Sequence, residues 1–343
     1  MISLRLLLFL LLSLGSLNAQ DGKPPNGPRA LQVQIFLDQN CFGPGFLDGK
    51  PGRFTSNAVY TYNRAQGRSP GDWAAVVKEA EAAVPDVFAT ATVPMVAKKF
   101  VNPRLPKTYE AQAKLKLLSY RSYLEFMAER YHTSESYLIE LNGRKKAFGA
   151  RPRSVLKVPN VIPFRIEEIR KGGSHPRDEV LSTRKVVIDT VKNALYIYDP
   201  SQQAPASPGT ALVVVSSKAS AEKTPQSLGK VIAMFPVTPG HERYIHRGTW
   251  KIVNSVEMPQ WRYDKQLLKT GKRSKEALQI AGGPNNPVGV VWNGLSRSGI
   301  GIHGTSSPRT IGRGRSSGCY RLANWDVARF PDFARPGATV IVR

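Results

Sequence analysis

Apolar residues follow two different spacings along the chain. Between residues 31 and 141 they recur mainly at steps of three and four, whereas after residue 183 they alternate with polar residues or form short runs. The first spacing is typical of amphipathic helices and the second of β-strands. We therefore expect a multidomain protein: small, largely helical modules precede a C-terminal, mostly β domain over residues 183–343, with a sandwich or barrel-like fold.

The first helical module is predicted over residues 28–70. Leu31 and Leu37 lie on the apolar face of a short helix, and Thr55 is placed to cap a second helix that carries Tyr62. Between the two helices, Gly-Pro-Gly and Asp-Gly indicate tight turns. The pattern F-G-P-G-x-x-D-G-x-x-G-x-x-T, followed by A-V-x-x-Y, resembles the small peptidoglycan-binding domain of wall enzymes. A generic small helical domain is the alternative.

A second module is predicted over residues 115–163, after a connector of residues 71–114 that holds one helix. Tyr120, Leu124 and Met127 share a helical face, Ser134 starts the next helix, and Asn142-Gly143 ends it. The patterns L-x-x-x-A-x-x-Y, L-I-x-L-N and L-K-V-P resemble a LysM domain, a β-α-α-β module that binds N-acetylglucosamine polymers. A plain helical hairpin is the alternative. Residues 164–182 are expected to be a charged linker.

The C-terminal domain begins with two strands that Lys192-Asn193 joins in a hairpin. Further strands are expected wherever apolar residues alternate or cluster between turn residues. The expected strands cover residues 186–188, 195–198, 211–215, 231–237, 248–252, 299–303 and 339–342.

The chain is strongly basic, with 49 Lys and Arg against 25 Asp and Glu and a net charge of +24. This charge favours an anionic partner such as a nucleic acid, an acidic membrane or a bacterial wall polymer, although a merely solvated basic surface gives the same count. At the N-terminus a basic residue, Arg5, precedes an apolar run from Leu6 to Leu17, and Ala19 offers a cleavage site. We expect residues 1–19 to be a secretory signal peptide.

Export has two consequences for the expected partners and location. It makes nucleic acid an unlikely partner and places the protein in the periplasm or the cell wall. The apolar run is shorter than the roughly twenty residues that span a bilayer, and no later stretch is apolar enough, so no transmembrane segment is expected after signal removal. An uncleaved membrane anchor is the alternative. We expect a monomer.

The chain has two cysteines, Cys41 and Cys319. A disulfide is the usual reading of an even count in an exported protein. The two cysteines fall in different predicted modules, however, so we expect a reactive Cys319 and a separate Cys41 buried as a small hydrophobe.

Two half-motifs near the C-terminus carry the candidate chemistry. The first is Gly301-Ile302-His303-Gly304-Thr305, and the second, Ser316-Ser317-Gly318-Cys319-Tyr320-Arg321, places its cysteine sixteen residues after the histidine. A free thiol has a pKa of about 8.5 and needs a neighbouring base to become nucleophilic at neutral pH. This part of the chain resembles the L,D-transpeptidases of the YkuD family. The resemblance lies in H-G-T, in the spacing to S-x-G-C-Y-R-L, and in Asn324 and Asp326 after it.

The resemblance implies a role for each residue of the two half-motifs. Cys319 would be the nucleophile and His303 its base, oriented by the carbonyl or amide of Gly304, and the amides of Gly318 and Cys319 would hold the oxyanion. Arg321 would meet a substrate carboxylate; an ion pair with Asp326 is its alternative role. Ser316 and Ser317 would donate hydrogen bonds to the substrate, or serve only as turn residues.

Two features of the sequence limit the resemblance or the chemistry. The family usually has T-P-x-G before a strand, where this chain has Ile245-His246-Arg247-Gly248, and His246 is the rival base. No clustered metal ligands and no phosphate-binding glycine loop appear, so no metal and no cofactor are expected.

The function that the resemblance implies is peptidoglycan cross-linking. The enzyme would be a cysteine-dependent acyltransferase that makes 3→3 cross-links through a cysteinyl thioester and releases D-alanine. Its partners would be the stem peptides and glycan strands of the wall. An L,D-carboxypeptidase that uses water as acceptor, or a non-catalytic wall-binding protein, remains the alternative.

Overall fold

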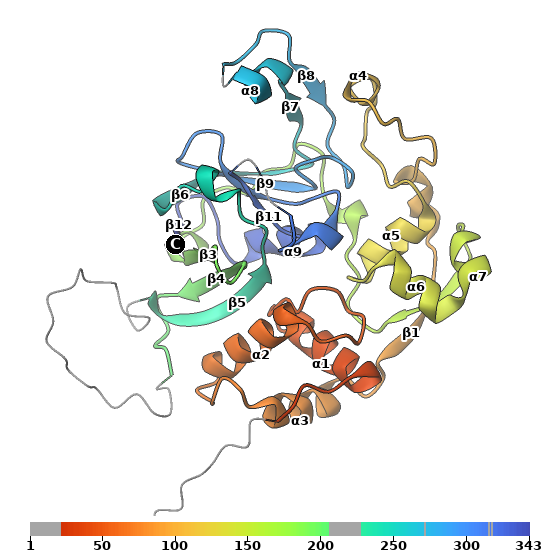
Figure 1. The fold of residues 1–343 in the computed structure, drawn as a ribbon, viewed down its shortest axis with the longest axis vertical. Helices are drawn as coiled ribbons and strands as arrows, with labels where there is room; N and C mark the ends of the chain where they lie inside the picture. Colours follow the sequence, from red (N-terminus) through yellow and green to blue (C-terminus); the bar gives the residue numbers. More distant parts are fainter. Residues whose placement is uncertain (1–21, 206–227, 271, 315, 317) are drawn as a thin grey trace, which may run out of the picture.

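We describe a computed structural model of the chain, which covers residues 22–205, 228–270, 272–314, 316 and 318–343. The signal peptide expected at residues 1–19, the strand expected at residues 211–215 and Ser317 lie outside the described residues. Figure 1 shows the N-terminal helices, the middle helices and the C-terminal sheet packed against one another. No helix in the described part of the chain is long and apolar enough to cross a membrane.

The N-terminal part is a helical unit whose apolar faces meet in a shared core. Asp72 caps its last helix through a hydrogen bond from the Ala75 amide, and Pro28 lies in the first turn of its first helix. Fully buried side chains such as Leu31 and Val76 fill the core, each contributing about 1.5–3 kcal/mol by burial. The helices are α1 (Gly27–Gln39), α2 (Arg53–Ala65) and α3 (Trp73–Ala83).

The middle part places helices between two antiparallel strands. Strand β1 pairs with β2 from Phe88↔Pro159 to Thr92↔Val155, and Ser122 and Ser134 cap the helices that follow them. This order differs from the expected β-α-α-β arrangement, because β1 precedes the predicted module of residues 115–163 and a 3-10 helix and four α-helices lie between the two strands; the LysM assignment stays a prediction. The elements are β1 (Phe88–Thr92), η1 (Met95–Lys99), α4 (Tyr109–Gln112), α5 (Tyr123–Arg130), α6 (Glu135–Asn142), α7 (Arg144–Phe148) and β2 (Val155–Pro159).

The C-terminal part confirms the expected mostly β domain. Its main sheet runs β11-β10-β9-β6-β12-β3-β4-β5, with β7 and β8 forming a separate hairpin near α4 (Figure 1). The strands are β3 (Lys185–Asp189), β4 (Ala194–Asp199), β5 (Lys230–Pro236), β6 (Gly248–Glu257), β7 (Trp261–Tyr263), β8 (Leu278–Ile280), β9 (Val291–Leu295), β10 (Gly301–His303), β11 (Tyr320–Arg321) and β12 (Thr339–Val342). The helical segments are η5 (Glu242–Tyr244), α8 (Lys265–Thr270), η6 (Pro308–Thr310), α9 (Asn324–Arg329) and η7 (Phe330–Asp332).

The two ends of the main sheet meet. Just after β5, Thr238 exchanges two backbone hydrogen bonds with Arg321 of β11, at 2.9 and 3.0 Å. The sheet is therefore curled into a barrel-like shape, and its closure lies beside the cysteine half-motif.

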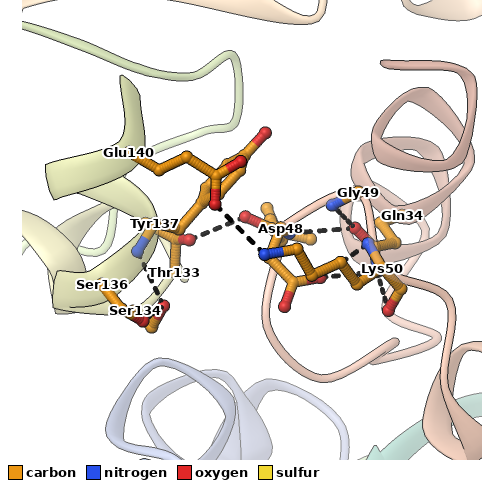
Figure 2. A network of polar contacts seen from close by, with 10 residues as sticks. Gln34, Asp48, Gly49, Lys50, Thr133, Ser134, Ser136, Tyr137 and Glu140 are labelled. Carbon is orange, nitrogen blue, oxygen red and sulfur yellow. Dashed lines mark hydrogen bonds and ion pairs between the residues drawn. The ribbon is translucent and has the colours of Figure 1, made fainter. Parts of the chain in front are cut away.

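The parts of the chain are docked by polar contacts as well as by apolar packing. One buried core contains side chains of the middle part, such as Tyr120 and Met127, together with Val290 and Trp325 of the C-terminal part. Between the N-terminal and the middle parts, Lys50 pairs with Glu140 of α6 at 3.1 Å (Figure 2). The three parts therefore share their interior.

Several local expectations were wrong. Thr55 does not cap α2, which begins after Gly52; its hydroxyl is buried and donates to the Pro44 carbonyl instead. Tyr120 precedes α5 rather than lying in it. Ile166, in the expected linker, is buried in the shared core.

The range expected to be a connector, residues 71–114, holds more structure than one helix. Its helix, α3, packs on α1, and it also contains β1, the strand that pairs with β2. Because β1 is separated from β2 by more than sixty residues, local spacing gave no sign of the pairing.

Candidate active site

Strand pairing brings the two half-motifs together. Strand β10 runs parallel to β11, with Ile302 opposite Tyr320 and His303 opposite Arg321. Side chains alternate between the two faces of a sheet, so Cys319, two residues before Arg321, lies on the same face as His303 and Arg321. The seventeen residues from His303 to Cys319 therefore start and finish at two neighbouring strand ends.

His303 is held in one orientation. Its side chain is buried, its Nδ1 lies 2.7 Å from the Gly304 carbonyl, and its ring stacks on Trp292 with centroids 5.4 Å apart. Since a carbonyl only accepts, Nδ1 carries the proton and Nε2 keeps its lone pair. Burial lowers the pKa of His303 to about 4, with a smaller contribution from the Arg321 charge, so the imidazole is neutral at pH 7. A neutral imidazole can accept a proton.

Cys319 is a free, half-buried thiol. Burial raises its pKa, while a hydrogen bond with the Gly301 backbone and the Arg321 charge oppose that rise. Its Sγ donates to the Gly299 carbonyl at 3.5 Å, and among the described contacts no hydrogen bond joins it to the imidazole. In this resting arrangement the thiol is protonated and must turn from Gly299 before it gives up its proton.

The turn before Cys319 is internally hydrogen bonded. The Gly318 amide donates to the Ser316 hydroxyl at 3.2 Å, and that hydroxyl donates to the Cys319 carbonyl. Ser316 is thus engaged as a turn residue in this structure. The Gly318 amide, expected to help hold an oxyanion, points at Ser316, whereas the Cys319 amide has no such partner among the described hydrogen bonds.

A second loop, residues 238–247, lies directly against the cysteine turn. A Cβ added to Gly240 would stand 2.7 Å from the Gly318 Cα, and Gly318 itself has a φ of +118°. Only glycine at these two positions permits the backbones to approach so closely. The same loop carries the rival base His246, but no contact between His246 and Cys319 is found in the described part of the chain.

Arg321 influences both reactive groups, because its charge lowers the pKa of His303 and that of Cys319. The alternative ion pair with Asp326 is not what the structure shows. Asp326 instead accepts from Arg329 at 2.7 Å. The charge of Arg321 therefore acts on the thiol and the imidazole, and its contact with a substrate carboxylate stays a prediction.

Asn324 and Gly289 are site residues that sequence reasoning missed. Asn324 was noted only as part of a motif, and its buried amide oxygen lies where the backbones of Gly304 and Gly289 meet. Gly289 has a φ of +63°. The turn-rich segment that ends at Gly289, Gly283-Pro284-Asn285-Asn286-Pro287-Val288-Gly289, was the available signal, but it did not indicate which distant backbone it would approach.

A cleft of about 490 Å³ lies between the N-terminal helices and the loop that connects the two half-motifs. Phe46, Phe54 and Trp325 line it, and the exposed Arg309 and Arg313 stand at its edge. The guanidinium of Arg53 crosses the cleft to the Gly312 carbonyl. Within the described residues, no group of three or more His, Cys, Asp or Glu side chains is arranged to hold a metal ion.

Curated proteins are similar to parts of this chain. A Bacillus subtilis (strain 168) protein named YkuD, provisionally an L,D-transpeptidase, is 39% identical over 59 residues, which are 17% of this chain and 36% of that protein. A Fuscovulum blasticum protein, named provisionally as an L,D-transpeptidase in an ATP synthase subunits region, is 33% identical over 110 residues, 32% of this chain and 57% of that protein. The chain thus spans only about a third to just over half of the length of these curated relatives.

Solved structures resemble the chain more distantly. An L,D-transpeptidase from Mycobacterium smegmatis gives a TM-score of 0.31 with 14% identity, over 56% of this chain and 74% of that one. The family model of the YkuD L,D-transpeptidase catalytic domain matches residues 183–342, which contain both half-motifs. Residues 183–342 are therefore similar to the L,D-transpeptidase catalytic domain of the YkuD family.

Proposed function

We propose that this protein is a peptidoglycan L,D-transpeptidase that forms 3→3 cross-links through a thioester on Cys319. The observation that carries the proposal is the parallel pairing of β10 with β11, because it sets the His303 and Cys319 half-motifs side by side within the matched catalytic domain. The activity, substrate and partners of the whole chain are part of this proposal.

The first half-reaction would acylate the thiol. Nε2 of His303 takes the proton of Sγ, and the sulfur attacks the carbonyl carbon on the L-centre of the stem's diamino acid. The carbon–nitrogen bond to D-alanine breaks, and the imidazolium returns its proton to the leaving amine. The Gly304 carbonyl accepts from Nδ1–H throughout and stabilises the imidazolium.

The second half-reaction would transfer the acyl group. An amine of a second stem attacks the thioester carbon, His303 takes the amine's proton, and the proton returns to sulfur as the new amide forms. The thioester conserves the energy of the original peptide bond, so no nucleotide is needed. The Cys319 amide is the oxyanion donor that the described hydrogen bonds leave available.

The same proposal includes the polymer as partner and the wall as location. The net charge of +24 and the apolar N-terminal run support export to an anionic wall. The cleft lined by aromatic rings and arginines, beside the loop that connects the two half-motifs, supports a contact with the carboxylate-bearing polymer.

The deciding experiment is to incubate the full chain with disaccharide-tetrapeptides and weigh the products by mass spectrometry. Cross-linked dimers that have lost one D-alanine support the proposal, and they should be absent with Cys319→Ala. Tripeptides alone would assign an L,D-carboxypeptidase instead. If neither product forms, and a carbapenem labels Cys319→Ala as well as it labels Cys41→Ala, the proposed nucleophile is wrong.

A further inference from the structure

Glu129 is a carboxylate buried between two parts of the molecule. It lies in α5, outside the matched catalytic domain, and its side chain is 6% exposed. Its Oε1 accepts from the Tyr120 hydroxyl at 2.6 Å, and both carboxylate oxygens lie within 3.2 Å of the Asn324 side-chain amide. Burial raises the pKa of Glu129 to about 8, more than the hydrogen bonds from Tyr120 and Asn324 lower it, so the group is largely a neutral acid at pH 7. Burying such a group is still costly, so one that reaches into a catalytic domain calls for a role.

Glu129 fixes which way the Asn324 amide points. The Nδ2 of Asn324 donates to Glu129 and to the Pro284 carbonyl at 3.2 Å, whereas its Oδ1 accepts from the Val290 amide at 3.3 Å. A flipped amide would set oxygen against the Pro284 carbonyl and Nδ2 against the Val290 N–H, and the Glu129 oxygens accept on the same side as Pro284. The acceptors on one side and the donor on the other allow a single orientation.

The oriented Asn324 oxygen packs against the backbone that holds the imidazole. A Cβ added to Gly304 would stand 2.2 Å from Asn324 Oδ1, and one added to Gly289 would stand 2.3 Å from it. Gly304 is thereby wedged between Asn324 and Gly289, and its carbonyl accepts the His303 Nδ1 proton. A continuous series of contacts therefore leads from Glu129 through Asn324 and Gly304 to His303.

We propose that Glu129 is a positioning residue for His303, acting through Asn324 and Gly304, so that the middle part of the chain completes the catalytic site. The proposal rests on the proposed function, since it assumes that His303 is the base for Cys319. Glu129 touches no reacting atom. It holds the His303 ring in one orientation by keeping the Gly304 carbonyl in place, so that Nε2 stays available to take the thiol proton.

The test compares Glu129→Leu and Glu129→Gln with the parent in a Cys41→Ala background, by the rate of Cys319 alkylation with iodoacetamide. A base-assisted thiol reacts at pH 7, whereas at pH 10 hydroxide can deprotonate the thiol directly and the base matters less, although burial raises the pKa of Cys319. We expect Glu129→Leu to lower the pH 7 rate about tenfold and to leave the pH 10 rate unchanged. Glu129→Gln keeps one acceptor oxygen, so its pH 7 rate should lie between those of Glu129→Leu and the parent. On tetrapeptide substrate, kcat should fall with little change in KM.

Glu125→Gln is the matched control. Glu125 lies one turn earlier on α5 and also reaches the catalytic domain, accepting from Asn285 at 3.0 Å, but it does not contact Asn324. If folded Glu129→Leu gives the same ratio of rates at pH 7 and pH 10 as Glu125→Gln and the parent, the proposal is overturned. If Glu129→Leu does not fold, Glu129→Gln and Tyr120→Phe are compared with the parent by the same ratio of alkylation rates at pH 7 and pH 10. Glu129→Gln should then show the larger fall in the pH 7 rate.

The alkylation readout separates this proposal from the proposed function. A parent that shows base-assisted alkylation but makes no cross-links would refute the reaction and leave the positioning role standing. A parent that cross-links, with Glu129 variants that keep its rate, would refute the positioning role alone.

Discussion

At the scale of single residues, burial sets the protonation of the reactive pair. The pKa of His303 is lowered to about 4 by burial, and that of Cys319 is raised by burial, so the resting pair at pH 7 is a neutral imidazole and a neutral thiol. This pair differs from a preformed thiolate–imidazolium ion pair. The base must therefore act during the attack.

The acid limb of Cys319 reactivity should therefore lie unusually low. Protonating His303 removes the base, and because its pKa is depressed, reactivity should persist below the ordinary histidine pKa of about 6.5 and disappear as the pH falls through about 4. The rate of iodoacetamide labelling in Cys41→Ala, followed from pH 3.5 to pH 10, measures this directly. A rate that already halves near pH 6.5 would contradict the buried, neutral imidazole.

Gly304→Ala should damage both stability and reactivity. The new Cβ would stand 2.2 Å from Asn324 Oδ1 and 3.0 Å from the Gly289 Cα, and neither neighbour can move freely. We expect the free energy of unfolding to fall by about 1–3 kcal/mol, as for overpacked interiors, and Cys319 labelling at pH 7 to be largely lost. Urea unfolding measures the first effect. Gly22→Ala, whose added Cβ would make only ordinary contacts at 3.5 Å, is the control and should change stability by no more than about 0.5 kcal/mol.

Sequence reasoning could name the reactive residues but not what holds them. Cys319, His303 and Gly304 sit in short motifs whose residue types carry their own chemistry. Glu129 is separated from Asn324 by 195 positions and looks like any acidic residue of an amphipathic helix. A contact that arises only when two parts of the chain dock leaves no local pattern.

At the scale of elements, prediction succeeded where the signal was local. The Ser134 cap and the Gly143 end of α6 follow from side-chain and backbone preferences within one turn. It failed at Thr55, because the hydroxyl finds the Pro44 carbonyl eleven residues away and leaves the cap to Gly52. Strand β11, Tyr320–Arg321, is too short to have any periodicity and exists because β10 and Thr238 flank it.

The edge of the cleft should contribute to polymer binding. Arg309 and Arg313 are exposed and stand beside the aromatic lining, so reversing both charges should weaken binding to an anionic wall polymer. We expect Arg309→Glu/Arg313→Glu to reduce co-sedimentation with isolated peptidoglycan severalfold at low salt, with less effect at high salt. Arg104→Glu/Lys107→Glu makes the same charge change away from the cleft. Equal losses in the two double variants would mean that net charge alone matters.

At the scale of the whole molecule, a buried ionic cluster joins all three parts. Asp38 of α1 pairs with Arg329 of α9 at 3.0 Å and with His132, beyond α5, at 2.9 Å. Burial alone would raise the pKa of Asp38, but Arg329 and His132 hold it well below its usual range. The cluster therefore holds the three parts together, and its contribution to stability depends on all three side chains.

Asp38→Asn should cost more stability at neutral than at acidic pH. A carboxylate with a depressed folded pKa stabilises the fold above its unfolded pKa of about 3.9, and this contribution is lost as the pH falls further. We expect a cost of about 3–5 kcal/mol at pH 7, which shrinks below about pH 4, measured by urea unfolding. Glu140→Gln, which breaks the exposed Lys50–Glu140 pair, should cost less than about 1 kcal/mol at either pH. A cost for Asp38→Asn that does not vary with pH would contradict the paired carboxylate.

The matched catalytic domain, residues 183–342, should not behave as an independent unit. Alone, it would leave the Asn324 amide without Glu129, the Arg329 guanidinium without Asp38, and Val290 and Trp325 without the middle helices that share their core. Each unpaired buried polar group costs about 1–3 kcal/mol, and a domain is stable by only about 5–15 kcal/mol in total. We therefore expect residues 183–343 expressed alone to unfold without a sharp transition and to lose base-assisted Cys319 labelling. A soluble fragment with a cooperative transition and the labelling rate of the full chain would show that the N-terminal parts only tether the enzyme.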